Sequence, residues 1–311
     1  MPAANPCQYP GDTPEDGGLA MYNGPMPVKM IAMDLDGTLL DSRGKLPEEN
    51  ARAIIEAAAR GAEILIVTGR RFHSARLTAA GLSCEVDFIA SNGALIKSRS
   101  GETHYQRLLP AVVARQVLDA TPEYRSCAGV IFDRPLERQV IFEKIDWNGA
   151  YVAPYLYRHR EQVAEVDPLT DCLDVEDPVE ILYLGDCASI QRVARQLAAS
   201  PLASEFTLAT TEYQARNLSM LDVLQRGVSK GAALAEWSSR RGIARAEIMA
   251  IGDNWNDREM LQYAGLPVVM GNAVAALREP GWETTLSNDD CGVAHAIRKH
   301  VLEVPAVHAR R

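Results

Sequence analysis

The most informative segment of the chain is Val28-Lys-Met-Ile-Ala-Met-Asp34-Leu-Asp36-Gly37-Thr38. Its first part is a short, nearly continuous apolar run, which is typical of a parallel strand buried on both faces. Two acidic residues follow at positions i and i+2, so their side chains would lie on the same side of the strand. Gly37 then allows the chain to turn sharply. We therefore predict a buried strand that ends in Asp34 and Asp36 at the edge of a sheet.

This pair of carboxylates indicates a metal site. Two carboxylates this close repel each other, and each raises the pKa of the other unless a cation lies between them. A hard divalent ion such as Mg²⁺, which prefers oxygen ligands, suits the pair. The alternative is a purely structural acidic turn. An EF-hand is excluded, because a loop that begins at Asp34 would place Lys45 where a bidentate Glu belongs.

Beyond this strand, apolar strands alternate with amphipathic helices. A helix is expected over 47–60, since Pro47 and two acidic residues open it and Gly61 follows its end. Apolar runs at 64–67 and 87–90 predict two further buried strands, with a helix through about residue 80 between them. This order predicts an α/β fold with a doubly wound parallel sheet, in which sites form at the carboxyl ends of the strands.

From about residue 109 to 226 the pattern changes to clustered strands with few helices. The expected helices are 111–120 and 189–199, and the expected strands are 129–132, 139–143, 179–184, 206–209 and 218–223. Such clustering predicts a separate α+β domain. After Gly227 the alternation resumes, with a helix at 230–241, a strand at 248–251, a helix from Asp257 and a strand at 267–270.

The simplest organisation is one α/β core with a domain inserted into it. We assign residues 28–108 and 227–311 to the core and residues 109–226 to the insertion. Residues 1–27 are rich in Pro, Gly and Asp, which predicts a disordered extension.

Two polar segments at the starts of predicted helices suggest an anion site. Thr68-Gly69-Arg70 follows the second strand, where a hydroxyl and free N–H groups suit an anionic oxygen, although Thr68 as a simple helix N-cap is the alternative. Lys230 follows Ser229, the expected N-cap of the next helix. Because the helix dipole disfavours a cation in the first turn, Lys230 indicates a nearby anion, unless it is a solvated surface lysine.

A third polar segment, Gly252-Asp253-Asn254-Trp255-Asn256-Asp257, follows the strand at 248–251. Its carboxylate and amide side chains would lie at the sheet edge where sites form. The alternative is an Asx-rich turn that caps the helix beginning near Asp257. Ser91-Asn92-Gly93, after the third strand, is a weaker signal and is interpreted as a turn.

Composition excludes several classes of protein. The 311 residues include 32 Lys and Arg against 41 Asp and Glu, for a formal net charge of −9, and 47% are hydrophobic. This is ordinary globular usage, and the acidic balance argues against a nucleic-acid groove or a site for anionic membranes. No apolar run approaches the roughly 20 residues that span a bilayer. Six scattered cysteines without a C-x-x-C pair suit free thiols, so we expect a cytoplasmic protein.

Taken in order, the polar segments resemble the motifs of the haloacid dehalogenase (HAD) superfamily of phosphohydrolases. Asp34-Leu-Asp36-Gly37-Thr38 is similar to the first motif, Thr68 to the second, Lys230 to the third, and Gly252-Asp253 with Asn256-Asp257 to the fourth. The position of the insertion, Ser91-Asn92-Gly93-Ala94 and Gly227-Val-Ser-Lys-Gly231 resemble the Cof-like sugar-phosphatase branch. The resemblance covers about residues 28–276 and implies a Rossmann-like HAD core with an inserted α+β cap.

The resemblance also implies a role for each site residue. Asp34 would be the nucleophile that forms an aspartyl-phosphate, and Asp36 would be the general acid and base. Mg²⁺ would be held by Asp34, Asp253 and the backbone carbonyl of Asp36. The expected phosphate-binding groups are Thr68, Gly69, Lys230 and Asn256. Asp257 would support the metal through a water molecule or orient Lys230.

The resemblance implies a Mg²⁺-dependent phosphatase for small phosphomonoesters, and sugar phosphates are the first candidate substrates. The insertion would close over the site as a lid. The expected partner is a small phosphorylated metabolite, without nucleic acid or membrane, and no protein partner is indicated. Two alternatives stay open: a phosphomutase or phosphotransferase, and a non-catalytic phosphometabolite-binding protein. The pair Asp34 and Asp36 argues against a pure binder. A dehalogenase or phosphonatase fits less well, because those relatives usually carry a helical cap between the first and second motifs.

Overall fold

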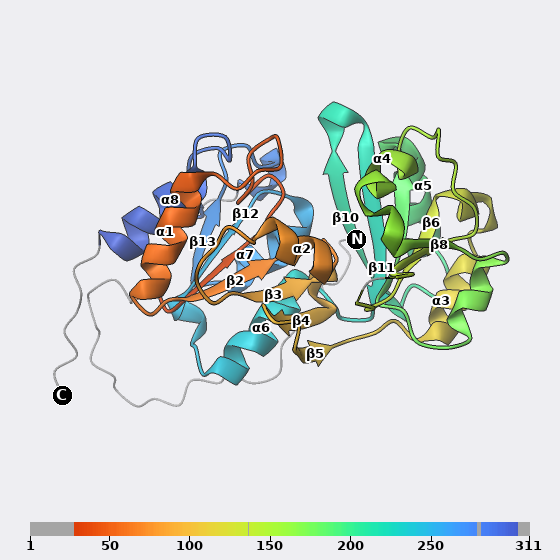
Figure 1. Cartoon of the computed structure of the whole chain (residues 1–311), viewed down its shortest axis with the longest axis horizontal. Coiled ribbons are helices and arrows are strands. Elements are labelled where there is room, and N and C mark those ends of the chain that lie inside the picture. The colour runs from red at the N-terminus through yellow and green to blue at the C-terminus, as the bar shows by residue number, and fades with distance from the viewer. Residues whose placement is uncertain (1–27, 136, 279–280, 304–311) are drawn as a thin grey trace, which may run out of the picture.

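A computed structural model describes residues 28–135, 137–278 and 281–303 of the chain. These residues form two sheets, one of eight strands and one of six. Figure 1 shows each sheet with its own helices as one of two lobes that lie side by side. The disorder predicted for residues 1–27 falls outside the described residues.

The larger sheet is mainly parallel and has β1 (Met30–Met33) near its middle. Its strand order is β14-β13-β12-β1-β2-β3-β4-β5. β1 pairs in parallel with β12 and β2, and Met33 is level with both Ile251 and Ile66. The segments that follow these strands therefore emerge at the same edge of the sheet. The remaining strands are β2 (Glu63–Val67), β3 (Asp87–Ala90), β4 (Leu95–Ser98), β5 (Thr103–Gln106), β12 (Ile248–Gly252), β13 (Leu266–Val269) and β14 (Glu283–Thr284).

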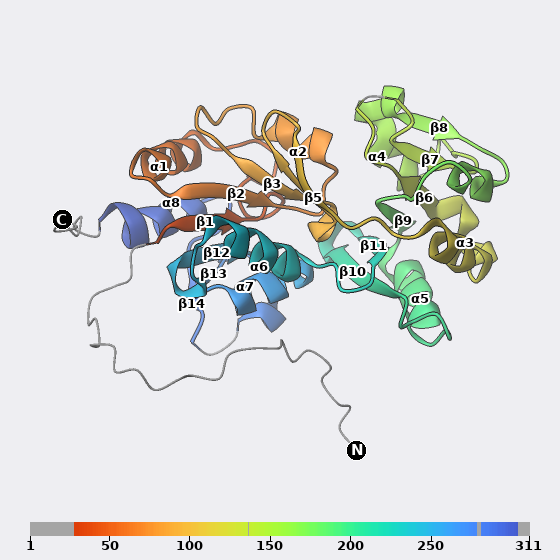
Figure 2. The same ribbon diagram turned by 90° about the horizontal axis from the view of Figure 1, so that it is seen from below.

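Helices cover both faces of this sheet, as a doubly wound fold requires. Figure 2 shows α1 (Glu48–Ala59) and α2 (Phe72–Thr78) on one face and α6 (Lys230–Arg241) and α7 (Arg258–Tyr263) on the other, and α8 (Gly292–Ile297) lies beside α1. α1 begins after Pro47, which is the N-cap residue, and its buried side is Asn50, Ala53, Ile54 and Ala57. The predicted helix over 47–60 is thus one residue too long at each end.

An antiparallel hairpin extends the sheet beyond β3, and sequence analysis did not predict it. Ser91 and Asn92 have positive φ angles of 47° and 51°, which reverse the chain in the short 3₁₀ helix η1 (Ser91–Gly93). β4 then runs back along β3, with Ile96 opposite Ile89, and β5 pairs with β4. The reversal places Asn92 at the same sheet edge as the ends of β1 and β12.

The smaller sheet has the strand order β10-β11-β9-β6-β7-β8. One face packs on α3 (Ala111–Asp119) and α5 (Cys187–Ala198) through a separate hydrophobic core. The other face shares a hydrophobic cluster with the first lobe, in which Leu182 and Phe142 join Ala90 and Leu95. The strands are β6 (Ala128–Ile131), β7 (Val140–Phe142), β8 (Val163–Glu165), β9 (Glu180–Gly185), β10 (Phe206–Tyr213) and β11 (Leu218–Gln225), and α4 is Val152–Leu156.

Short turns of helix complete the described chain. The important one for the site is η7 (Trp255–Asp257), directly after β12. Among the described residues, we find no helix with the length and apolar character needed to cross a membrane. The other short helices are η2 (Pro122–Cys127), η3 (Tyr157–Gln162), η4 (Leu169–Leu173), η5 (Gln214–Arg216), η6 (Arg245–Glu247), η8 (Ala275–Leu277) and the π-helical η9 (Arg298–Leu302).

Candidate active site

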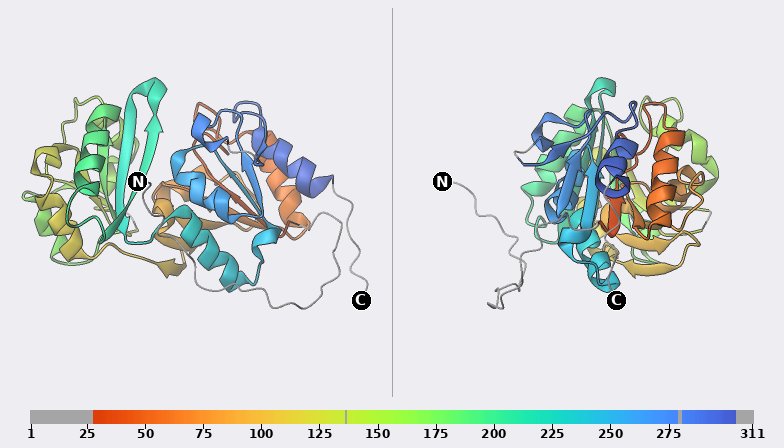
Figure 3. Two further views of the ribbon diagram at one scale, coloured as in Figure 1. Left: turned by 180° about the vertical axis from the view of Figure 1, so that it is seen from behind. Right: turned by 90° about the vertical axis from the view of Figure 1, so that its left-hand side faces the viewer.

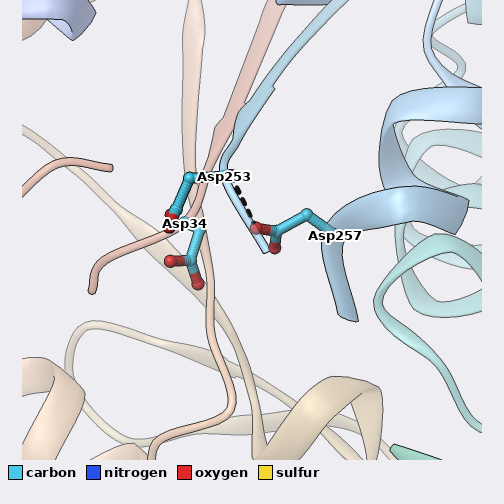
Figure 4. Close-up of side chains that lie close together, drawn as sticks. All are labelled: Asp34, Asp253 and Asp257. Carbon is cyan, nitrogen blue, oxygen red and sulfur yellow. Dashed lines mark hydrogen bonds between the residues drawn. The ribbon is translucent and has the colours of Figure 1, made fainter. Parts of the chain in front are cut away.

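Three buried aspartates gather at the carboxyl edge of the larger sheet. Asp34 follows β1, and Asp253 follows the adjacent β12, so the parallel register of these strands brings the two side chains together. Asp257 comes from η7, and Figure 4 shows its carboxylate turned toward the backbone at Asp253. One carboxylate oxygen of each aspartate lies within 4.8 Å of the others. Such a group of oxygen ligands is suited to a hard divalent cation.

Lys230 reaches this cluster from the start of α6. Its Nζ donates to Oδ1 of Asp34 and to Oδ1 of Asp257, both at 2.6 Å. Ser229 is the N-cap of the helix and its hydroxyl accepts from the N–H of Ala232, as the sequence predicts. The alternative of a solvated surface lysine is wrong, because only 1% of the Lys230 side chain is exposed.

Charge–charge interactions hold Lys230 protonated. Burial alone lowers the pKa of Lys230, but the charges of Asp257 and Asp34 and the hydrogen bonds to them outweigh burial, so its pKa lies above the ordinary value. Of the two roles expected for Asp257, the structure shows direct contact with Lys230. Oδ2 of Asp257 also accepts from the N–H groups of Asp253 and Asn254, both at 2.9 Å, which orders the loop after β12.

The carboxylates outnumber the ammonium group that neutralises them. Burial raises the pKa of Asp34 to about 7, against the lowering effect of Lys230, and the charges of Asp257 and Asp36 raise it further. Burial and the charges of Asp257 and Asp34 likewise raise the pKa of Asp253 well above its usual range. Three buried carboxylates around one lysine leave an excess of negative charge, so a bound divalent cation fits this cluster.

In the turn after β1, the backbone of Gly37 lies directly against the carboxylate of Asp253. Thr38 donates from Oγ1 to Oδ1 of Asp253 at 2.7 Å. Gly37 has a φ of +85°, and a Cβ at this position would lie 2.4 Å from Oδ2 of Asp253. Only glycine combines this backbone conformation with this close approach.

We therefore expect Gly37→Ala to weaken divalent-metal binding as well as to destabilise the protein. The positive φ alone costs about 1–2 kcal/mol for a residue with a Cβ, and the clash displaces the Asp253 carboxylate. Gly44→Ala is the matched control, because Gly44 has a φ of +72° and a Cβ there would meet no atom within 4 Å. Thermal unfolding with and without metal measures both effects. Equal losses of metal-dependent stabilisation in the two variants would contradict the expectation.

Asp36 is held by an arginine that the sequence analysis did not single out. Arg70 donates from Nε and from Nη2 to the two carboxylate oxygens of Asp36, each at 2.6 Å. The only signal for this role was the position of Arg70 directly after Thr68-Gly69. Such a bidentate pair fixes the plane of the carboxylate as well as its position.

Thr68 is not a helix N-cap, so that alternative is wrong. The N-cap residue of α2 is Arg71, and the hydroxyl of Thr68 instead accepts from the N–H of Arg70 at 3.1 Å, within a tight turn. Thr68 and the adjacent Gly69 thus line the sheet edge in a non-helical segment. Gly69 lies under Asn92, whose amide would be 3.2 Å from a Cβ at this position.

Asn256 connects to a chain of polar side chains that extends into the second lobe. Its Nδ2 donates to Oδ1 of Asn92 at 2.9 Å, and Nδ2 of Asn92 donates to Oδ2 of Asp222 at 2.7 Å. Asp222 belongs to β11 of the smaller sheet. Sequence analysis interpreted Asn92 as part of a turn and missed Asp222, although a single acidic residue within Leu221-Asp-Val-Leu224 is a detectable signal.

The β10–β11 hairpin lies on the side of the second lobe that faces the first lobe, as Figure 1 and the left view of Figure 3 both show. Tyr213, at the end of β10, is near the carboxylates: burial raises its pKa, and the charges of Asp36, Asp34 and Asp253 raise it further. Between β10 and the sheet edge is a cavity of about 500 Å³. Its lining includes Thr207, Thr210, Glu212, Lys230, Trp255 and Asn256.

Comparison with known proteins identifies the family. The model of the haloacid dehalogenase-like hydrolase family matches residues 31–297. The chain belongs to this family. The HAD-type fold is also that of a haloacid dehalogenase-like hydrolase from Bacteroides thetaiotaomicron, which superposes with a TM-score of 0.73 at 24% identity and covers 87% of this chain and 98% of its own. Hydrolases of this family generally use a divalent metal ion, and the buried aspartate cluster is present here.

Curated relatives of this HAD hydrolase include phosphatases. The Bacillus subtilis 5-amino-6-(5-phospho-D-ribitylamino)uracil phosphatase YcsE is 28% identical over 275 residues, which are 88% of this chain and 96% of that protein. The Arabidopsis thaliana protein named endoribonuclease YBEY, chloroplastic, is 29% identical over 93% of this chain, but the chain spans only about half (49%) of its length. Together with the family match, the relatives that are named as phosphatases show that the protein is a phosphatase of the HAD superfamily.

Proposed function

We propose that this HAD phosphatase is a Mg²⁺-dependent enzyme that hydrolyses small phosphomonoesters, with sugar phosphates as the first candidates, through an aspartyl-phosphate. The observation that carries the proposal is the position of Asp34. This buried carboxylate lies beside a lysine ammonium and within an aspartate cluster that is short of positive charge. A nucleophile that attacks a phosphate dianion needs its own negative charge neutralised, which Lys230 does in part and a bound divalent cation would complete.

Asp34 is the nucleophile in this proposal. Lys230 bonds Oδ1 of Asp34, which leaves Oδ2 to attack phosphorus and form the aspartyl-phosphate. In the structure both carboxylate oxygens of Asp36 accept from Arg70. In this proposal Asp36 turns away from Arg70 and takes up a proton from solvent, gives that proton to the leaving oxygen, and then takes one from the water that hydrolyses the intermediate. Both carboxylates belong to the turn after β1, so one rigid segment carries the two reacting groups.

The remaining groups hold the metal and the phosphoryl oxygens. Mg²⁺ would be held by Asp34, Asp253 and the backbone carbonyl of Asp36, and when bound it neutralises charge between the substrate and the nucleophile. Asp257 keeps Lys230 and the loop after β12 in place. The proposed donors to the phosphoryl oxygens are Thr68, the N–H of Gly69, Lys230 and Asn256.

The inserted residues 109–226 are proposed to be the lid that selects the substrate. The cavity under β10 offers the hydroxyls of Thr207 and Thr210, the carboxylate of Glu212 and the half-exposed ring of Trp255. This mixture suits a polyhydroxylated molecule that also presents an apolar face. The YcsE phosphatase is named for a substrate with a phosphorylated ribityl chain, which belongs in the test panel. Neither nucleic acid nor a membrane is part of the proposal, and the site of action would be the cytoplasm.

The test is release of inorganic phosphate from a panel of sugar, nucleotide and ribityl monophosphates. We expect release with Mg²⁺, none after EDTA, and recovery when Mg²⁺ is restored. Product analysis by NMR separates hydrolysis from the phosphomutase alternative, because a mutase interconverts two phosphate esters without releasing phosphate. Failure to release phosphate from any substrate, with the protein folded and metal bound, would point to the mutase or to a non-catalytic binder.

A further inference from the structure

A continuous line of hydrogen bonds joins the lid sheet to the phosphate-binding edge. It runs from Asp222 on β11 through Asn92 in η1 to Asn256 in η7, with bonds of 2.7 Å and 2.9 Å. Asn92 is 1% exposed and Asp222 is 6% exposed, so water does not compete for the bond between them, whereas Asn256 is half-buried and lines the cavity. The line passes from one lobe to the other at Asn92, whose backbone φ of 51° lies in the left-handed region.

The orientation of both amides follows from Asp222. An ionised carboxylate can only accept, so the Asn92 amide must turn its Nδ2 toward Asp222 and its Oδ1 toward Asn256. Asn256 must then present its NH₂ group to Asn92. One hydrogen of that group is used in this bond, and the second is available to an anion at the sheet edge.

The middle of the line has little freedom to move. Gly93 has a φ of +108°, and a Cβ there would lie 2.3 Å from the carbonyl oxygen of Ser229 at the start of α6. η1 is therefore packed directly against the helix that carries Lys230. Asn92 can change its amide orientation, but its position is fixed.

We propose that Asp222 is a positioning residue of the lid which, through Asn92, directs the NH₂ group of Asn256 to the phosphoryl group. This inference rests on the proposed phosphate site. It means that the anion site is complete only while β11 is seated on η1. The lid would thus act on the phosphoryl end of the substrate as well as on the rest of the molecule.

The charged groups around Asp222 allow it to ionise near neutral pH. Burial raises the pKa of Asp222 to about 7, while the Asn92 hydrogen bond and the charge of Lys230 lower it. Glu180 on β9 is also buried; burial and the charge of Asp222 raise its pKa well above the usual range, against the effect of Arg71. A protonated Asp222 can also donate a hydrogen bond, to Oδ1 of Asn92. The amides of Asn92 and Asn256 are then no longer restricted to one orientation.

The experiment measures sulfate binding by calorimetry in full-length Asp34→Asn protein at a fixed, saturating concentration of Mg²⁺. Sulfate remains a dianion from about pH 5.5 to about pH 8.5, and the background variant removes both turnover and the titration of Asp34. At the upper pH, adding Asp222→Asn should weaken sulfate binding about fivefold, the difference between a well-directed donor to an anion and an undirected one. At the lower pH the two proteins should bind alike.

A double-mutant cycle with Asn256→Ala separates positioning from general damage. If Asp222 acts through Asn256, Asp222→Asn should change nothing in the Asn256→Ala background. A structural defect would give the same loss in both backgrounds. Asn92→Gly, which tolerates the φ of 51°, is the second variant and should reproduce the loss without adding to that of Asp222→Asn. Glu180→Gln is the matched control and should bind sulfate as the background does.

Other outcomes of these binding measurements would contradict the inference. Removing a nearby negative charge strengthens sulfate binding if electrostatics alone operates, so tighter binding in Asp222→Asn overturns the inference. Additive losses with Asn256→Ala overturn it too, while leaving the phosphate site intact. If the Asp34→Asn protein with Mg²⁺ bound takes up no sulfate at any pH, the proposed phosphate site itself is wrong, and the positioning role is wrong with it.

Discussion

Asp34→Asn is expected to lower phosphate release by about 10⁴-fold or more, since the nucleophile is lost and nothing else in the cluster replaces it. The variant should remain folded, because the amide keeps the size of the carboxylate and removes one of the crowded negative charges. Steady-state kinetics with Mg²⁺ on the best substrate of the panel measures the effect. An unchanged midpoint of unfolding, recorded on the same samples, would show that activity is lost with the nucleophile and not through unfolding.

The control for Asp34→Asn is Asp41→Asn. Asp41 lies in the same connection after β1, but its carboxylate is engaged in its own turn with Arg43 and Lys45. Its loss should leave kcat within about twofold, since the hydrogen bonds of its carboxylate stay within its own turn, away from the aspartate cluster. Substantial phosphate release by Asp34→Asn would exclude the aspartyl-phosphate intermediate and would favour direct attack of water on phosphorus.

Lys230→Met is expected to damage both stability and activity. The substitution keeps the volume of the side chain but leaves Asp34 and Asp257 buried without their shared cation. Breaking a buried ion pair in this way costs about 3–5 kcal/mol of the free energy of unfolding. Activity should also fall, because the proposed site loses its one lysine contact to the phosphoryl group. Urea denaturation and steady-state kinetics measure the two effects.

The pH dependence of Lys230→Met has a definite sign. Without the ammonium group, the pKa of Asp34 rises further, and a carboxyl whose folded pKa exceeds its unfolded value loses stability as pH rises through the folded pKa. The variant should therefore diverge from the wild-type protein as pH rises past about 7, where Asp34 ionises beside Lys230 in the wild type but stays protonated in the variant. Lys29→Met is the control, because Lys29 pairs with Glu247 at the surface, where such pairs contribute at most about 1 kcal/mol. Similar losses in the two variants would contradict a buried ion-pair role.

Most of the core could be predicted from local sequence patterns. The strand at 87–90 has the predicted limits, and the helix at 230–241 begins and ends as expected. These elements are encoded locally, by an uninterrupted apolar run in one case and by Ser229 and Gly242 as caps in the other. The β4–β5 hairpin was missed, because its strands depend on the positive φ angles of Ser91 and Asn92, which the residue types alone do not specify.

Which side chains follow β1, β2 and β12 could be predicted from the chain alone, because each polar segment comes directly after an apolar run. The partners of these side chains depend on the folded structure: Lys230 lies between two aspartates, Arg70 binds Asp36, and Asp222 binds Asn92. A hydrogen bond between distant segments requires placement and orientation to within a fraction of an ångström. That precision comes from how the two lobes pack, and no periodicity or motif spacing contains it.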